Sequence, residues 1–161
     1  MNKELIKGLA KLGLLVVMIM IAAGTSAKAQ SLEYKLTANI PFDFSVADKK
    51  FQAGEYSVGR ASVSNGDMVV QVRSADGHEN INRITVPVVS RTLTNRASLV
   101  FHRYGDEYFL FQIWPAGANT GRALPKSRGE KDVERKIHDN VAGLAMKAPQ
   151  IENVTIVANL P

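Results

Sequence analysis

Cysteine is absent from this chain of 161 residues. Without a thiol there is no disulfide framework and no cysteine-ligated metal site, and a lipid-anchored cysteine after the leader is excluded as well. Hydrophobic residues nevertheless make up 45% of the chain, which excludes a disordered tail. An apolar core must therefore hold the fold unaided, and the length suits one domain.

The amino-terminal segment has the pattern of a signal peptide. Three lysines precede an uncharged run over residues 12–24, and Ala27 and Ala29 provide small residues for a cleavage site. A helix over that run rises about 20 Å, whereas a hydrocarbon core is about 30 Å thick. We therefore expect a signal peptide over 1–29 and a single exported, β-rich domain over 30–161, periplasmic or extracellular. An uncleaved N-terminal anchor is the alternative.

Net charge is small in the part of the chain expected to fold. The full sequence carries a formal charge of +5, and removing Lys3, Lys7, Lys11, Lys28 and Glu4 with the leader reduces this to +2. Nucleic-acid binding usually shows a concentrated basic face or a recognised motif. The composition thus predicts no nucleic-acid partner, and we expect no stable membrane span after cleavage.

Alternating hydrophobicity dominates the mature chain and predicts strands. Apolar residues occupy the even positions over 32–46, which predicts one long bent strand or two short ones, because Pro41 has no N–H to give to a ladder. Asn65-Gly66 and Asp76-Gly77 predict turns. Further strands are expected over 55–63, 68–73, 84–90, 98–103, 108–114 and 154–158.

The segment 98–114 is predicted to be a hairpin with two apolar faces. A two-residue loop at Gly105-Asp106 would place Phe101 opposite Leu110 and Leu99 opposite Gln112. An antiparallel hairpin with one solvated face would alternate, so something must cover the second face. One face is expected to carry Leu99, Phe101, Tyr108, Leu110 and Trp114, and the other Val100, Phe109, Phe111 and Ile113.

A carboxy-terminal helix is the internal candidate for that cover. Ser127 and Glu130 form a capping-box pattern, and Pro149 ends any helix that follows. We expect an amphipathic helix over 128–146 that docks on the hairpin through Val133, Ile137, Val141 and Leu144. The predicted fold is mainly β: an antiparallel β-barrel or β-sandwich of about seven strands with one C-terminal amphipathic helix.

No recognised catalytic constellation is found along the chain. The three histidines have no metal-ligand spacing, and no Gly-x-Ser-x-Gly pentapeptide occurs. Asp106 and Glu107 are adjacent and are interpreted as solvated turn residues rather than a glycosidase pair. The glycine-containing loop 117–122 lacks the Gly-Lys-Ser/Thr ending of a phosphate-binding loop. We therefore expect no catalytic residue, no metal and no cofactor.

Four motifs of the mature chain are similar to a known group of sequences. They are IPFDF at residues 40–44, AGEY at 53–56, FHRYGDEYFL at 101–110 and GRALPKSR at 121–128. With these motifs the chain resembles an uncharacterised family of predicted secreted bacterial proteins with no known activity. The resemblance implies secretion and a β-rich domain, and it transfers no functional site.

Three functions compete at this level. The first is an exported, non-enzymatic module that binds an unknown protein partner or contributes to the cell envelope. The second is a carrier for a small apolar ligand. The third and weakest is a small hydrolase or isomerase, which would need His102 near a carboxylate in a cleft. The candidate residues for a ligand or partner site are His102, Arg103, Tyr104, Phe109, Phe111 and Trp114.

Overall fold

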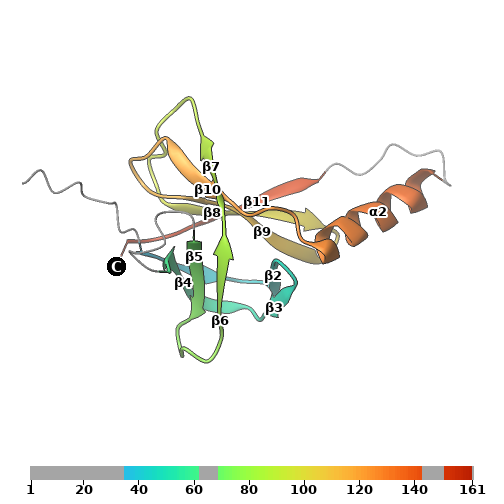
Figure 1. The fold of residues 1–161 in the computed structure, drawn as a ribbon, viewed down its shortest axis with the longest axis horizontal. Helices are drawn as coiled ribbons and strands as arrows, with labels where there is room; N and C mark the ends of the chain where they lie inside the picture. The colour runs from blue at the N-terminus through green and yellow to red at the C-terminus, as the bar shows by residue number, and fades with distance from the viewer. Residues whose placement is uncertain (1–34, 62–68, 143–150, 161) are drawn as a thin grey trace, which may run out of the picture. The chain divides into compact units, whose positions relative to one another are not determined.

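A computed structural model describes residues 35–61, 69–142 and 151–160 of the chain. The expected signal peptide, the Asn65-Gly66 turn, Leu144 and Pro149 lie outside these residues. The described part contains one helix and eleven strands in two sheets (Figure 1), so the mainly β prediction is confirmed although the number of strands exceeds the expected seven. The strands are β1 (Lys35–Ile40), β2 (Phe44–Val46), β3 (Lys49–Phe51), β4 (Gly54–Arg60), β5 (Val69–Ser74), β6 (Asn80–Ile84), β7 (Val86–Val89), β8 (Ser98–Tyr104), β9 (Glu107–Trp114), β10 (Thr120–Ala123) and β11 (Glu152–Val157).

Two open sheets form the framework. The four-stranded sheet has the order β1-β4-β5-β6, and the seven-stranded sheet has the order β11-β8-β9-β10-β7, with β2 paired to β9 and β3 paired to β2. Strands β6 and β7 are separated by the single buried residue Thr85 and run on from one another (Figure 1), so one extended segment joins the two sheets. Near the other end of the sheet order, Thr37 and Asn159 form an isolated bridge.

The predicted run over 32–46 is two short strands rather than one long one. Strand β1 ends at Ile40, directly before Pro41, and β2 begins at Phe44. Strand β2 then turns through Ala47, which has a φ of 55°, and pairs with β3. This turn was not predicted, because alanine carries no turn signal, and it places β2 beside the start of β9.

The core lies between the two sheets. In the aromatic part of the core, Phe44 contacts Phe51, Tyr56 and Phe101 at ring-centre distances of 5.4, 5.0 and 5.5 Å. Alternate residues of most strands point inward, as period-2 sequence patterning requires. The buried members from the four-stranded sheet are Leu36, Ala38, Ile40, Tyr56, Val58, Val70 and Val72, and those from the other sheet include Val46, Leu99, Leu110 and Ile113.

The hairpin over 98–114 is present, but its register changes at a β-bulge. The loop at Gly105 has the positive φ of 66° and Phe101 pairs with Leu110 as predicted. Beyond Val100 the register shifts, so Leu99 pairs with Ile113 and not with Gln112. A bulge inserts one unpaired residue, and the alternation of the faces reverses past it. Ile113 therefore lies on the same face as Leu99 and joins the core, and the prediction that Trp114 shares the face of Leu99 and Phe101 was wrong.

Strand β10 is the clearest element that the sequence did not predict. Thr120–Ala123 pairs with both β9 and β7 where the sequence suggested a glycine-containing loop. Gly121 is needed there because a Cβ at this position would lie 2.7 Å from ring atoms of Trp114. The close approach of backbone and indole requires a residue that has no side chain.

Helix α2 (Arg128–Ala142) begins as predicted, but the aliphatic residues whose side chains are described are not its most buried ones. The Ser127 hydroxyl accepts a hydrogen bond from the Glu130 N–H at 3.1 Å, which is the capping contact expected at the first turn. Val133 and Ile137 are only half-buried, whereas the Glu130 side chain is buried. The expected docking through an aliphatic stripe is not seen at Val133 and Ile137, and the innermost contact of the described helix is a carboxylate; the side chain of Val141, like Leu144, lies outside the described residues.

Candidate functional site

A buried polar cluster of His102, Tyr104 and Glu130 lies where strand β8 meets the first turn of α2. His102 Nδ1 is 2.6 Å from Glu130 Oε1, and the Tyr104 hydroxyl donates to the same oxygen at 3.2 Å. The side chains of His102 and Glu130 are 7% and 6% exposed. Two donors on one carboxylate oxygen give strong, charge-assisted hydrogen bonds in a region that water barely reaches.

Aromatic rings enclose the imidazole of this cluster. His102 stacks on Phe111 with a centroid distance of 3.8 Å, and Tyr104 meets Phe109 edge to face at 5.8 Å. Phe111 is the residue left unpaired by the bulge, so the irregularity aims its ring at His102. The second face of the hairpin is thus filled at this end by rings and by the first turn of α2.

A lysine extends the cluster toward solvent. The Lys126 ammonium donates to both carboxylate oxygens of Glu134 at 2.8 Å and lies 6.0 Å from the centre of the Tyr104 ring. Burial raises the pKa of Tyr104, and the nearby ammonium opposes this only in part. The pKa of Lys126 is also raised, because contacts with Glu134 and Tyr104 outweigh its desolvation.

The six residues selected from the sequence do not form one site. His102, Tyr104, Phe109 and Phe111 come together around Glu130. Arg103 instead hydrogen-bonds to Glu152 at 3.2 Å and lies over Tyr108. Trp114 is bound to Gln112 and packs on Gly121 at the far end of β9.

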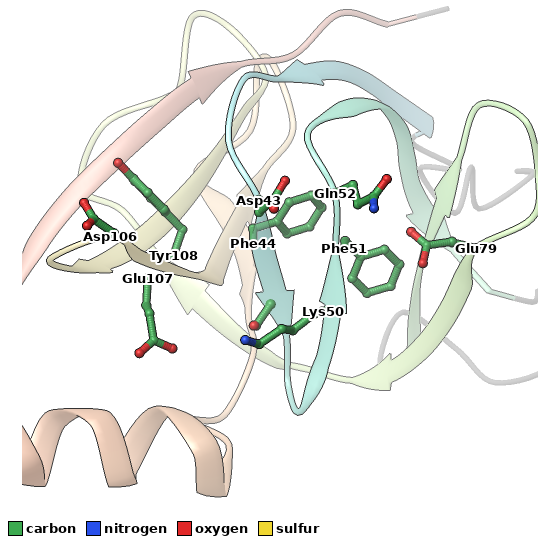
Figure 2. A pocket seen from close by; sticks show the side chains of 10 residues that line it. Asp43, Phe44, Lys50, Phe51, Gln52, Glu79, Asp106, Glu107 and Tyr108 are labelled. Atoms are coloured by element: carbon green, nitrogen blue, oxygen red, sulfur yellow. The ribbon is translucent and has the colours of Figure 1, made fainter.

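A separate open cleft of about 510 Å³ lies beside the β2–β3 hairpin. Figure 2 shows Asp106 and Glu107, from the β8–β9 turn, on one side of this hairpin and Glu79 on the other. Four carboxylates and one amine, that of Lys50, line the cleft, so its charge is negative. The remaining lining residues are Asp43, Phe44, Ser45, Phe51, Gln52 and Tyr108.

A second cleft of about 320 Å³ continues the first, because both are lined by Gln52 and Glu79. It adds the carboxylates of Glu55 and Asp76. A hydrogen bond from the Ser74 hydroxyl, with a second from the His78 N–H, lowers the pKa of Asp76 and keeps it ionised. The two clefts together form an acidic groove, which we define by Asp43, Glu55, Asp76, Glu79, Asp106 and Glu107.

Sequence reasoning missed both the Glu130 contact and the acidic groove. Glu130 was identified only as a capping residue, and Asp106 and Glu107 only as turn residues. The groove draws its carboxylates from four separate segments, so no local spacing could reveal it. A weak signal existed in the IPFDF motif, where Asp43 interrupts an apolar run; its carboxylate accepts a hydrogen bond from the Ala53 N–H at 2.8 Å.

Within the described ranges, no group of three or more histidine, aspartate or glutamate residues is placed to hold a metal ion. In the same ranges no helix combines the length and the apolar character that a membrane crossing needs. Comparison of the chain with protein-family models, with curated proteins and with solved structures found no match in any of the three.

Proposed function

We propose that the chain is an exported, non-enzymatic binding module that holds a basic segment of a protein partner in the acidic groove. The observation that supports this proposal is the groove itself: six carboxylates and a single lysine line two adjoining clefts. In a domain with a small net charge, such a concentration of one sign attracts a ligand of the opposite sign. A sandwich-like arrangement of the two open sheets suits this role, because it displays the groove on rigid strands and turns.

The groove favours an extended ligand over a single ion. Its two parts have volumes of about 510 and 320 Å³, and the half-buried ring of Tyr108 lies among the carboxylates, whereas Phe44 and Phe51 line the cleft as buried core residues. A peptide can place lysine ammonium or arginine guanidinium groups near the carboxylates while its apolar side chains and aliphatic stems lie along the apolar parts of the groove wall, including the Tyr108 ring. We therefore expect a peptide that alternates basic and apolar residues to bind better than a small polyamine.

The other two functions are supported less well. The apolar-ligand carrier would use Phe109, Phe111 and Trp114, but Phe109 is buried beneath the polar cluster and Trp114 packs on Gly121. A hydrolase or isomerase would use His102, which does have a carboxylate beside it. Both groups of that pair are nearly inaccessible, however, and His102 lines neither cleft of the groove.

Calorimetric titration with a synthetic peptide of alternating lysine and leucine tests the binding proposal. The double variant Asp106→Asn with Glu107→Gln removes two groove carboxylates without changing side-chain size. Each exposed pair is worth about 0.2–1 kcal/mol, so loss of two pairs should raise the dissociation constant about twofold to thirtyfold. The matched control Asp132→Asn with Asp139→Asn removes the same charge from exposed positions of α2. Equal weakening in both double variants would refute a specific groove.

Export is tested separately, by sequencing the amino terminus of the product released from a bacterial host that expresses the full chain. The proposal expects the mature protein to start at Gln30, after cleavage at Ala29. A product that keeps Met1 and stays with the cell membrane would support the anchor instead.

A further inference from the structure

Among the side chains of α2 that the structure describes, the one buried against the seven-stranded sheet is a carboxylate and not an apolar residue. Of the helix residues whose side chains the structure describes, Glu130 alone is buried, and its partners His102 and Tyr104 belong to β8. Val133 and Ile137 are half-buried, and Lys131, Asp132, Arg135 and Lys136 are exposed. The most buried contact of the described helix is therefore made by a single charged side chain.

Acid would weaken this contact in two ways. A protonated Glu130 gives up the charge-assisted hydrogen bonds that it accepts from His102 and Tyr104. Beside a neutral Glu130, a protonated imidazole would be a buried cation without a carboxylate partner. The Lys126 ammonium near Tyr104 adds a like charge to the same region.

The other ionisable groups near the cluster lie outside it or are paired elsewhere. Glu130 is therefore the group whose protonation would break the contact. Asp48 accepts from the Gly129 N–H at 3.0 Å outside the buried cluster, and Glu134 is bound to Lys126. From β9, Glu107 is exposed opposite Tyr104, and Phe109 and Phe111 are not ionisable. From β11, the residue opposite His102 is Asn153, and the adjacent Glu152 pairs with Arg103 at the surface.

We propose that His102, Tyr104 and Glu130 form an acid-sensitive contact that releases helix α2 from the sheet while both sheets remain folded. Release would uncover the imidazole of His102 and the ring of Tyr104, which both hydrogen-bond to the buried Glu130. The core between the sheets contains none of these three residues, so its packing does not depend on the helix. The device is independent of the acidic groove and of its ligand.

Energy transfer from the single tryptophan measures the release directly. The chain has one tryptophan and no cysteine, so a dansyl probe on Lys136→Cys reports only its distance from Trp114. Acidification should change the transfer reversibly while the strand signal in circular dichroism persists. At neutral pH, Glu130→Gln should already show the transfer efficiency that the unsubstituted chain reaches in acid. Acidification of this variant should not change that efficiency further. Glu134→Gln, a neutral substitution one turn further along the same helix, should behave as the unsubstituted chain.

Two results would overturn the proposal. One is Glu130→Gln with unchanged transfer at neutral pH, which would mean that the carboxylate does not hold the helix. The other is a change of transfer on acidification that coincides with loss of the strand signal in circular dichroism. A Glu130→Gln chain that does not fold would count as the same result. Tyr104→Phe provides a milder test, because removing one donor from the carboxylate should move the release midpoint to higher pH. An unmoved midpoint would also contradict the proposal.

Discussion

Replacement of Gly121 by alanine tests the closest packing contact in the seven-stranded sheet. A Cβ at this position would lie 2.7 Å from two ring atoms of Trp114 and 2.9 Å from the carbonyl oxygen of Ile113. The indole can swing away, but the carbonyl belongs to the paired strand β9 and cannot move alone. Relief therefore requires a shift of β10 against β9.

The expected cost follows from two opposing effects. Overpacking of a well-packed site costs about 1–3 kcal/mol, whereas alanine gains about 0.4–1 kcal/mol by restricting the unfolded chain. The net loss in the free energy of unfolding is therefore about 1–2 kcal/mol. For a domain of this size the melting temperature should fall by about 4–8 °C.

Urea denaturation followed by Trp114 emission is the assay, because the residue at the contact is the only tryptophan in the sequence. The emission of the folded variant should shift to the red as the indole is pushed toward water. Gly54→Ala is the matched control, since its Cβ would come no closer than 3.7 Å to Tyr56. If Gly121→Ala were as stable as Gly54→Ala and kept the original emission, the reasoning from this contact would be refuted.

Three further predictions concern the core and the start of α2. Phe101→Ala should lower the free energy of unfolding by about 3–5 kcal/mol in urea denaturation, because its ring is fully buried. Ser127→Ala removes the hydroxyl that accepts from the Glu130 N–H and should cost about 1 kcal/mol in the same assay. A hydrogen bond from the Gly129 N–H, and to a smaller extent one from the Ser127 side chain, holds the pKa of Asp48 below its usual 3.8. The ionised Asp48 therefore adds to the free energy of unfolding in full above pH 3.8, and this addition is lost as the pH falls through the lower pKa of the folded state. In Asp48→Asn, the free energy of unfolding should fall less steeply with decreasing pH in the acid range. A fall as steep as that of the original chain would contradict the assignment.

Local signals explain which elements the sequence could predict. The loop at Gly105, the strand break before Pro41 and the capping serine before α2 each depend on residues within a few positions of one another. All three are present in the structure. In these segments the backbone preference and the apolar pattern favour the same local structure, and that structure is the one observed.

Long-range contacts explain what the sequence could not predict. Strand β10 contains a glycine because an indole packs on it, which is visible only once β9 and β10 are paired. His102 and Glu130 are 28 residues apart, and the sequence indicated the histidine as a site candidate but Glu130 only as a capping residue. The bulge at Phe111 reverses which face of the hairpin the following residues occupy. Strict alternation along the strand therefore predicted the wrong face for Trp114.

The bridge between Thr37 and Asn159 can form only after most of the chain has been brought together, so we expect it to form late in folding. Its two N–H···O bonds, both 2.8 Å long, join residues 122 positions apart. Strand β11, just before Asn159, also provides the outer neighbour of β8. Closing so large a loop is slow, and until it closes both β1 and β8 present unpaired edges to other chains. Folding at high concentration should therefore compete with aggregation, and a chain cut before residue 151 should aggregate most.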